Sequence, residues 1–76
     1  MSEYVFSLEI HDQPDVLVRI MQAIHRRGGC IRSLRIEPQQ PWAKMHIRVQ
    51  GVNNPDQIAR TLEKLVDARR VRTVTN

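Results

Sequence analysis

Alternating apolar and polar residues predict strands in three parts of the chain. In the first strand, which we place over Tyr4 to His11, every second residue is apolar. The cleanest alternation covers 42–50, where Ala43, Met45, Ile47 and Val49 share one face. Between these two strands, Cys30 to Glu37 alternates imperfectly, and a bulge or burial on both faces would explain the defect. A loop containing two prolines, residues 38–41, is short enough to join the last two strands as a hairpin.

Two further stretches repeat apolar residues at helical spacing. The first helix is predicted from about Pro14 to Arg27, with Gly28 in the left-handed position that ends many helices. The second begins at Asn54-Pro55-Asp56, which supplies an N-cap, a proline and an acidic first turn, and it fades near Asp67-Ala68. The expected buried stripes are Val16, Leu17, Ile20, Met21 and Ile24 in the first helix, and Ile58, Leu62, Leu65 and Val66 in the second.

A short last strand begins at Arg69-Arg70 and contains Val71, Thr73, Val74 and Thr75, so the order of elements is βαββαβ. This order is the split-βαβ, ferredoxin-like pattern of the α+β class. Right-handed crossovers place both helices on one face of a four-stranded antiparallel sheet. The length of 76 residues predicts a single domain over 1–76.

The amino-acid composition limits the class of protein to which this chain can belong. The chain is 41% hydrophobic and 26% charged, a globular balance rather than a disordered one. No apolar run approaches the ~20 residues that cross a bilayer, and the N-terminus resembles no signal peptide. We therefore expect a cytoplasmic protein that does not enter a membrane. A small domain has a thin stability margin, which self-association would widen.

The net charge of +4 suits an anionic partner, and most of the basic residues are arginines. Arg26-Arg27 end the first helix and Arg69-Arg70 begin the last strand, which makes these four residues candidates for contact with an acidic protein. Aromatic residues make up only 4% of the chain, so a platform for stacking bases is poorly supplied, and we expect no nucleic-acid partner.

Catalytic and metal-binding patterns are missing from the sequence. The three histidines lack metal-ligand spacing, and the single cysteine, Cys30, is expected to be a buried structural thiol rather than a nucleophile. We predict no catalytic residues, no metal site and no cofactor bound by this chain. One ligand site is conceivable, since the loop before Val16 ends at a helix N-terminus, where free N–H groups attract anions. Asp15 would oppose an anion there.

The turn Gly28-Gly29-Cys30-Ile31 lies at the other end of that helix, about 20 Å away at ~1.5 Å per residue. The loop and the turn can face each other only across a dimer.

The βαββαβ order with Asp12-Gln13-Pro14-Asp15-Val16-Leu17 resembles the ACT domain, a regulatory fold of amino-acid metabolism. The stretches 26–34 and 62–71 resemble small subunits of acetolactate synthase, and the short length with the Pro14-Asp15 pair resembles the short, valine-insensitive type.

The resemblance implies a homodimer that binds and activates a catalytic subunit, which itself holds thiamine diphosphate, Mg and FAD. It also implies an amino-acid effector site between the loop of one chain and the turn of the next. The residues that this carries over are Asp12, Gln13, Pro14, Asp15, Val16, Gly29, Cys30 and Ile31.

Three positions depart from the family's valine-binding pattern. Asp12 and Cys30 replace asparagines, and Asp15 replaces a glycine. Fewer amide hydrogen bonds and an added charge predict weak or absent valine feedback. The alternatives are a free-standing ACT homodimer that senses another small effector, and a basic nucleic-acid binder of the same fold.

Overall fold

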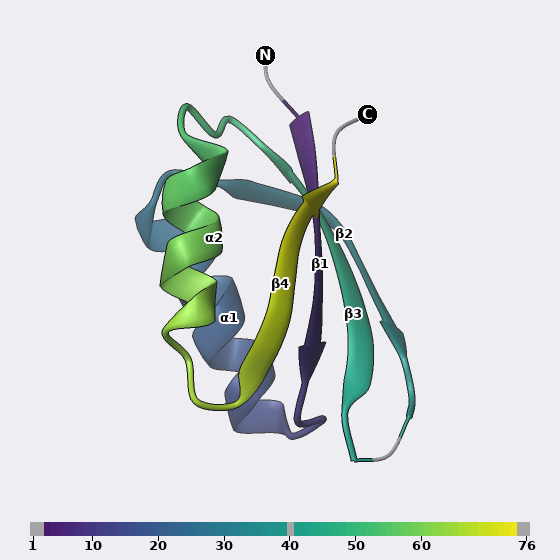
Figure 1. The fold of residues 1–76 in the computed structure, drawn as a ribbon. Helices are drawn as coiled ribbons and strands as arrows, with labels where there is room; N and C mark the ends of the chain where they lie inside the picture. Colours follow the sequence, from purple (N-terminus) through teal and green to yellow (C-terminus); the bar gives the residue numbers. More distant parts are fainter. Residues whose placement is uncertain (1–2, 40, 75–76) are drawn as a thin grey trace.

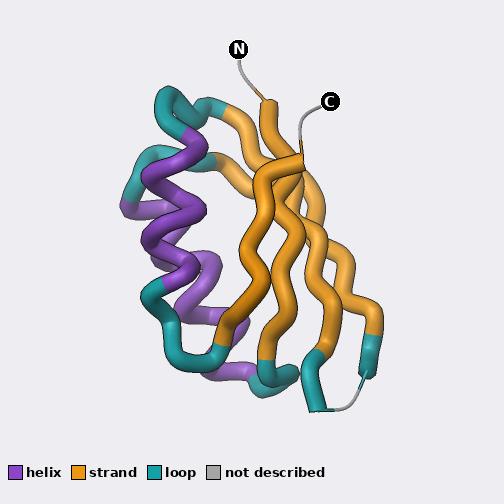
Figure 2. The backbone as a smooth tube through the Cα atoms, viewed as in Figure 1, coloured by secondary structure: helices purple, strands orange, loops and turns teal. Residues whose placement is uncertain are grey.

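The computed structural model describes residues 3–39 and 41–74 and consists of two layers, a sheet and a pair of helices (Figures 1 and 2). In chain order the elements are β1 (Glu3–Ile10), α1 (Pro14–Arg26), β2 (Cys30–Glu37), β3 (Ala43–Gln50), α2 (Pro55–Glu63) and β4 (Ala68–Val74). Thr75 of the predicted last strand and Gln40 of the predicted loop lie outside the described residues.

The four strands are antiparallel and lie in the order β2-β3-β1-β4. Both crossovers, through α1 and through α2, bring the helices to the same face of the sheet (Figure 2). The predicted fold class is therefore confirmed. The order also leaves β2 and β4 as the two edges of the sheet.

The hydrophobic core lies between the sheet and the helices. Alternation in β1 and β3 sends one set of residues inward, and the matching stripes of the helices cover it. Complete burial of such a side chain contributes about 1.5–3 kcal/mol to the hydrophobic driving force. The buried residues of the four central elements are Phe6, Leu8, Ile10, Val16, Ile20, Ile24, Ala43, Met45, Ile47, Val49, Ile58 and Leu62.

Both edge strands contain an irregularity. In β2 the pairing with β3 shifts between Ile31 and Ser33, which confirms the bulge suggested by the imperfect alternation. In β4 the pairing with β1 shifts opposite Ser7 and Glu9, and Arg70 there has a positive φ of 53°. The β4 bulge has no counterpart among the sequence-based expectations.

The second helix is shorter than predicted. It ends at Glu63, and hydrogen bonds from Leu65 N–H to the Leu62 carbonyl and from Ala68 N–H to the Leu65 carbonyl turn the chain toward β4. Val66 lies on this turn and is 91% exposed, so its predicted burial is wrong. A helix continued to Asp67 would leave no chain to bring buried Ala68 back beside Ile10.

Two smaller corrections concern residues near the sheet. Cys30 is exposed, not buried as predicted, because it is the first residue of an edge strand and no helix covers it. Trp42, predicted to lie within the third strand, precedes β3 instead and stacks on His11, with ring centroids 4.0 Å apart. Among the described residues, no helix combines the length and the apolar character needed to cross a bilayer.

Candidate effector and partner-binding sites

The loop between β1 and α1 forms a tight approach to the helix. Gln13 N–H donates to the His11 carbonyl at 2.8 Å, and Gln13 then serves as the N-cap with no hydrogen bond from its side chain. Pro14 begins the helix with the φ that a first turn requires, and Asp15 is the acidic residue of that turn. The loop backbone is thus ordered, while the first-turn N–H groups receive no side-chain cap from Gln13.

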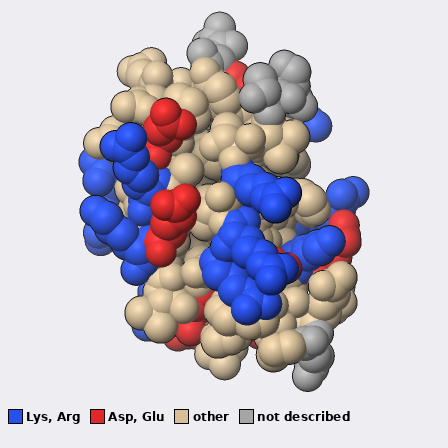
Figure 3. All heavy atoms as spheres, viewed as in Figure 1, with Lys and Arg blue, Asp and Glu red and all other residues tan. Residues whose placement is uncertain are grey.

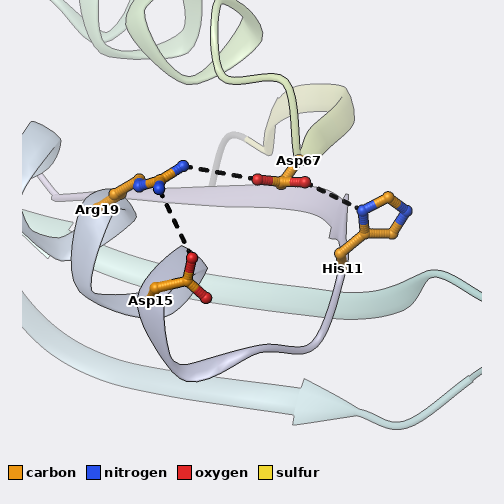
Figure 4. A network of polar contacts seen from close by, with 4 residues as sticks. All are labelled: His11, Asp15, Arg19 and Asp67. Carbon is orange, nitrogen blue, oxygen red and sulfur yellow. Dashed lines mark hydrogen bonds and ion pairs between the residues drawn. The ribbon is translucent and has the colours of Figure 1, made fainter.

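A polar network holds this loop against the α2–β4 turn (Figure 4). The Asp67 carboxylate lies between His11 Nδ1, at 3.1 Å, and Arg19 Nη1, at 3.7 Å. The backbone strengthens the link, since His11 N–H donates to the Asp67 carbonyl at 3.0 Å. Sequence reasoning missed this network because its members are 56 residues apart and share no motif.

The network also changes the surroundings of Asp15. Arg19 Nη2 lies 3.6 Å from the Asp15 carboxylate, one helical turn along α1 (Figure 4). Both side chains are more than half exposed, so the pair itself contributes about 0–1 kcal/mol. The Arg19 guanidinium partly offsets the charge of the Asp15 carboxylate, so an anion at the helix N-terminus would meet less repulsion than Asp15 alone would cause.

At the other end of α1 the chain turns through two glycines. Gly28 has a φ of 81°, and its N–H donates to the His25 carbonyl while Gly29 N–H donates to the Ile24 carbonyl. This pair of bonds is the Schellman arrangement that ends a helix. A Cβ at Gly29 would lie 2.7 Å from Val49 Cγ1, so this glycine permits close packing of helix on sheet.

The turn borders a hollow of about 460 Å³, a size that fits a small ligand. Its lining contains the predicted residues Gly29, Cys30 and Ile31, joined by Met21 and His25 from α1. The sequence analysis did not single out His25 as a site residue, and it placed Met21 in the buried stripe, whereas Met21 is 39% exposed because it lies beside the edge strand β2. Residues 21 and 25 are one helical turn apart, a spacing that offered a signal.

The loop borders a separate hollow of about 570 Å³. Asp12 and Gln13 line it, together with His11 and the β2–β3 connection residues Pro38, Gln39 and Pro41. The two hollows lie at opposite ends of α1, whose 13 residues span about 20 Å. The structure therefore does not bring the two halves of the predicted effector site together within one chain. Val16 is only 2% exposed and belongs to the core.

The four arginines predicted to contact a partner lie on different layers. Arg26 and Arg27 line a groove of about 450 Å³ between α1 and α2, whereas Arg69 and Arg70 lie on β4 (Figure 1). Arg69 is already engaged, since its Nε lies 2.8 Å from Glu9 Oε1 and its guanidinium covers the Trp42 ring at 4.2 Å. Within residues 3–39 and 41–74, no group of three metal-ligating side chains was found.

The sequence and the fold of this chain are similar to those of known proteins. Acetolactate synthase small subunit 2, chloroplastic, from Arabidopsis thaliana is 32% identical over 79 residues. The match covers 100% of this chain but only 17% of that protein, so the chain spans about a sixth of the length of its curated relative.

Solved structures agree in fold. The acetolactate synthase small subunit from Thermotoga maritima superposes with a TM-score of 0.80 and 25% identity, over 96% of this chain and 47% of that one. The ACT domain of GTP pyrophosphokinase from Chlorobium tepidum has a TM-score of 0.73 and 15% identity, over 95% and 96% of the two chains. Residues 12–71 match the ACT domain family, and the chain belongs to that family.

Proposed function

We propose that this ACT domain is a non-catalytic small subunit that binds and activates the catalytic subunit of acetolactate synthase, in branched-chain amino-acid biosynthesis. The main support is its 32% identity to a plant acetolactate synthase small subunit along the whole of this chain. The acetolactate synthase small subunit from Thermotoga maritima adds a close match in fold. In this proposal thiamine diphosphate, Mg and FAD belong to the catalytic subunit, and the complex works in the cytoplasm.

The proposal includes a homodimer formed through β2. This strand is an edge of the sheet, and its inward-facing residues Ile31, Leu34 and Ile36 are only partly buried. On α1, Met21 lines the hollow next to Ile31 and is 39% exposed. A two-fold axis beside β2 would extend the sheet and cover this apolar strip, as edge strands commonly require.

The same dimer would complete an effector site. With the two α1 helices antiparallel, the hollow at Asp12 and Gln13 of one chain meets the hollow at Cys30 of the other. The groups at this junction are less suited to binding valine than those of the valine-binding pattern. Cys30 offers only a weak hydrogen-bond donor where the pattern has an asparagine, and Asp15 adds a negative charge where it has a glycine. We therefore propose weak or absent inhibition by valine.

The decisive experiment measures acetolactate formation by the catalytic subunit from the same genome, with and without the full chain. A several-fold rise in kcat/KM on adding the chain is the expected result, and valine added to the same assay leaves this rise unchanged. If the chain fails both to activate the catalytic subunit and to co-purify with it, the proposal is contradicted.

A second candidate function is a free-standing ACT homodimer that senses another small effector. The mainly apolar hollow at Met21, Gly28 and Ile31 supports it, because such a surface suits a nonpolar amino-acid side chain. A thermal-stability screen of the isolated chain against the twenty amino acids separates the two functions. A saturable rise in Tm without any catalytic subunit would favour the sensor.

A further inference from the structure

The bulge in β4 gathers arginines on one face of the sheet. On β1, Ser7 and Glu9 are two residues apart and face away from the helices, while their partners on β4, Arg72 and Arg69, are three residues apart. In a regular strand, residues three apart point to opposite faces. The extra residue, Arg70, absorbs the difference with its positive φ of 53°, so Arg69 and Arg72 both pair with outward-facing residues.

Arg70 and Arg72 border a shallow hollow on the helix-free side of the sheet. The hollow measures about 220 Å³, and Arg70, Arg72 and Lys44 line it together with Ser7, Glu9 and His46. We call Lys44, Arg70 and Arg72 the basic triplet. Figure 3 shows Lys and Arg side chains gathered over the sheet beside β4, apart from a second group over the helices.

The acidic residues nearby leave the basic triplet undercompensated. Glu9 is 15% exposed, and its carboxylate already serves two arginines, Arg69 at 2.8 Å and Arg70 at 3.6 Å. Lys44 lies opposite Glu9 on β1 and Glu37 on β2, but among the described residues neither Lys44 nor Arg72 has an ion pair. Two basic groups therefore lie beside the Glu9 cluster with their charge open to a partner.

From this arrangement we infer that the basic triplet binds an acidic segment of another protein. The hollow is smaller than the 300–1,000 Å³ typical of small-molecule sites, and its lining contains no Phe, Tyr or Trp side chain on which a base could stack. A second copy of this chain would present the same positive charges and be repelled. The identity of the partner rests on the proposed function, under which the segment belongs to the catalytic subunit.

The experiment compares two doubly neutralised variants that lose the same charge. Arg70→Gln with Arg72→Gln removes two charges from the sheet face, and Arg60→Gln with Lys64→Gln removes two from the exposed helix layer. Binding of each full chain to the immobilised catalytic subunit is measured over a range of salt concentrations. We expect the sheet variant to bind about tenfold more weakly, mainly through slower association, with a shallower salt dependence, and the helix variant to stay within about twofold of wild type.

The single variant Arg72→Gln serves as the control for misfolding, because it breaks no ion pair and leaves the positive φ at Arg70 unchanged. We expect it to weaken binding about threefold. Equal losses in the two double variants would overturn the inference, because net charge alone would then explain the binding. If wild type does not bind the catalytic subunit, the proposed function fails, and the face is tested separately. For this, a synthetic peptide rich in Asp and Glu is titrated against the labelled chain.

In that titration, amide shifts confined to outward-facing residues of β1, β3 and β4 support the inference. Shifts confined to the helices, or none, overturn it. A single-stranded oligouridine that binds the triplet more tightly than the peptide would also overturn it, by assigning the face to nucleic acid.

Discussion

Single residues at the end of α1 show how closely the helix layer is packed on the sheet. Gly28 supplies a left-handed φ of 81°, whereas Gly29 has an ordinary φ and is needed for space. A Cβ at position 29 would lie 2.7 Å from Val49 Cγ1 and 2.8 Å from Ile24 Cγ2. Both neighbours are fully buried, so they have little room to move.

We predict that Gly29→Ala lowers the free energy of unfolding by about 1–3 kcal/mol, because it overpacks this contact. Urea denaturation followed by circular dichroism measures the change. Gln22→Ala, an exposed substitution on the same helix, is the control and should stay within about 0.5 kcal/mol. A Gly29→Ala protein as stable as this control would contradict the packing role.

The proposed effector site also depends on individual residues. Asp15→Gly with Cys30→Asn removes a carboxylate and restores an amide at the α1–β2 turn. We expect this double variant to gain valine binding, since it removes one repelling charge and restores one amide, and a hydrogen bond contributes about 0.5–1.5 kcal/mol. Calorimetry of the variant and the wild type, with D-valine as the ligand control, makes the measurement. No gain in heat on adding L-valine would argue against this site.

At the scale of elements, the two helices begin differently. The side chain of Asn54 caps α2 by accepting from Gln57 N–H at 3.3 Å, whereas Gln13 makes no such bond at α1. Helix α2 has only 9 residues, and isolated helices of that length are not stable in water. Its cap and its two buried residues, Ile58 and Leu62, therefore matter more than they would in a longer helix.

Asn54→Ala should lower the free energy of unfolding by about 0.5–2 kcal/mol, the usual cost of a lost N-cap. The neighbouring exposed residue provides a matched control, Asn53→Ala, which removes the same side chain outside the cap. Thermal and urea unfolding of both variants would be compared. If the two substitutions cost the same, Asn54 is not acting as a cap.

For the whole molecule, the edges of the sheet govern assembly. Both edges have a bulge and exposed arginines, two features that discourage strand pairing, and β2 differs by its partly buried apolar strip beside Met21. The two edges are thus suited to different contacts. In our proposals β2 serves the homodimer, and the sheet face beside β4 serves the acidic partner.

Met21→Lys should convert the dimer to a monomer at micromolar concentration, because it places a charge in the apolar strip next to Ile31. Sedimentation equilibrium measures the molecular mass directly. Gln22→Lys is the control, since Gln22 lines the groove between the helices instead, and it should leave the mass unchanged. A wild-type chain that is monomeric throughout this range would refute the β2 dimer.

Much of the fold was predictable from the sequence, for a physical reason. Alternation with a period of two determines the faces of β1 and β3, and the proline, acidic and glycine signals at the helix ends locate Pro14, Gly28 and Pro55. These signals are local, because each acts within a few residues of the chain. The order of the elements and the covered face of the sheet then follow from the right-handed crossover rule.

Only the tertiary structure decided the features that depend on residues far apart in the chain. The His11–Asp67 contact, the bulge that turns Arg72 outward and the exposure of Val66 all arise where α2 and β4 return to β1. The sequence by itself determined the elements and their apolar faces, because each depends on short-range periodicity. The surfaces on which the proposals rest were decided by strand pairing, since register between distant segments sets which side chains share a face.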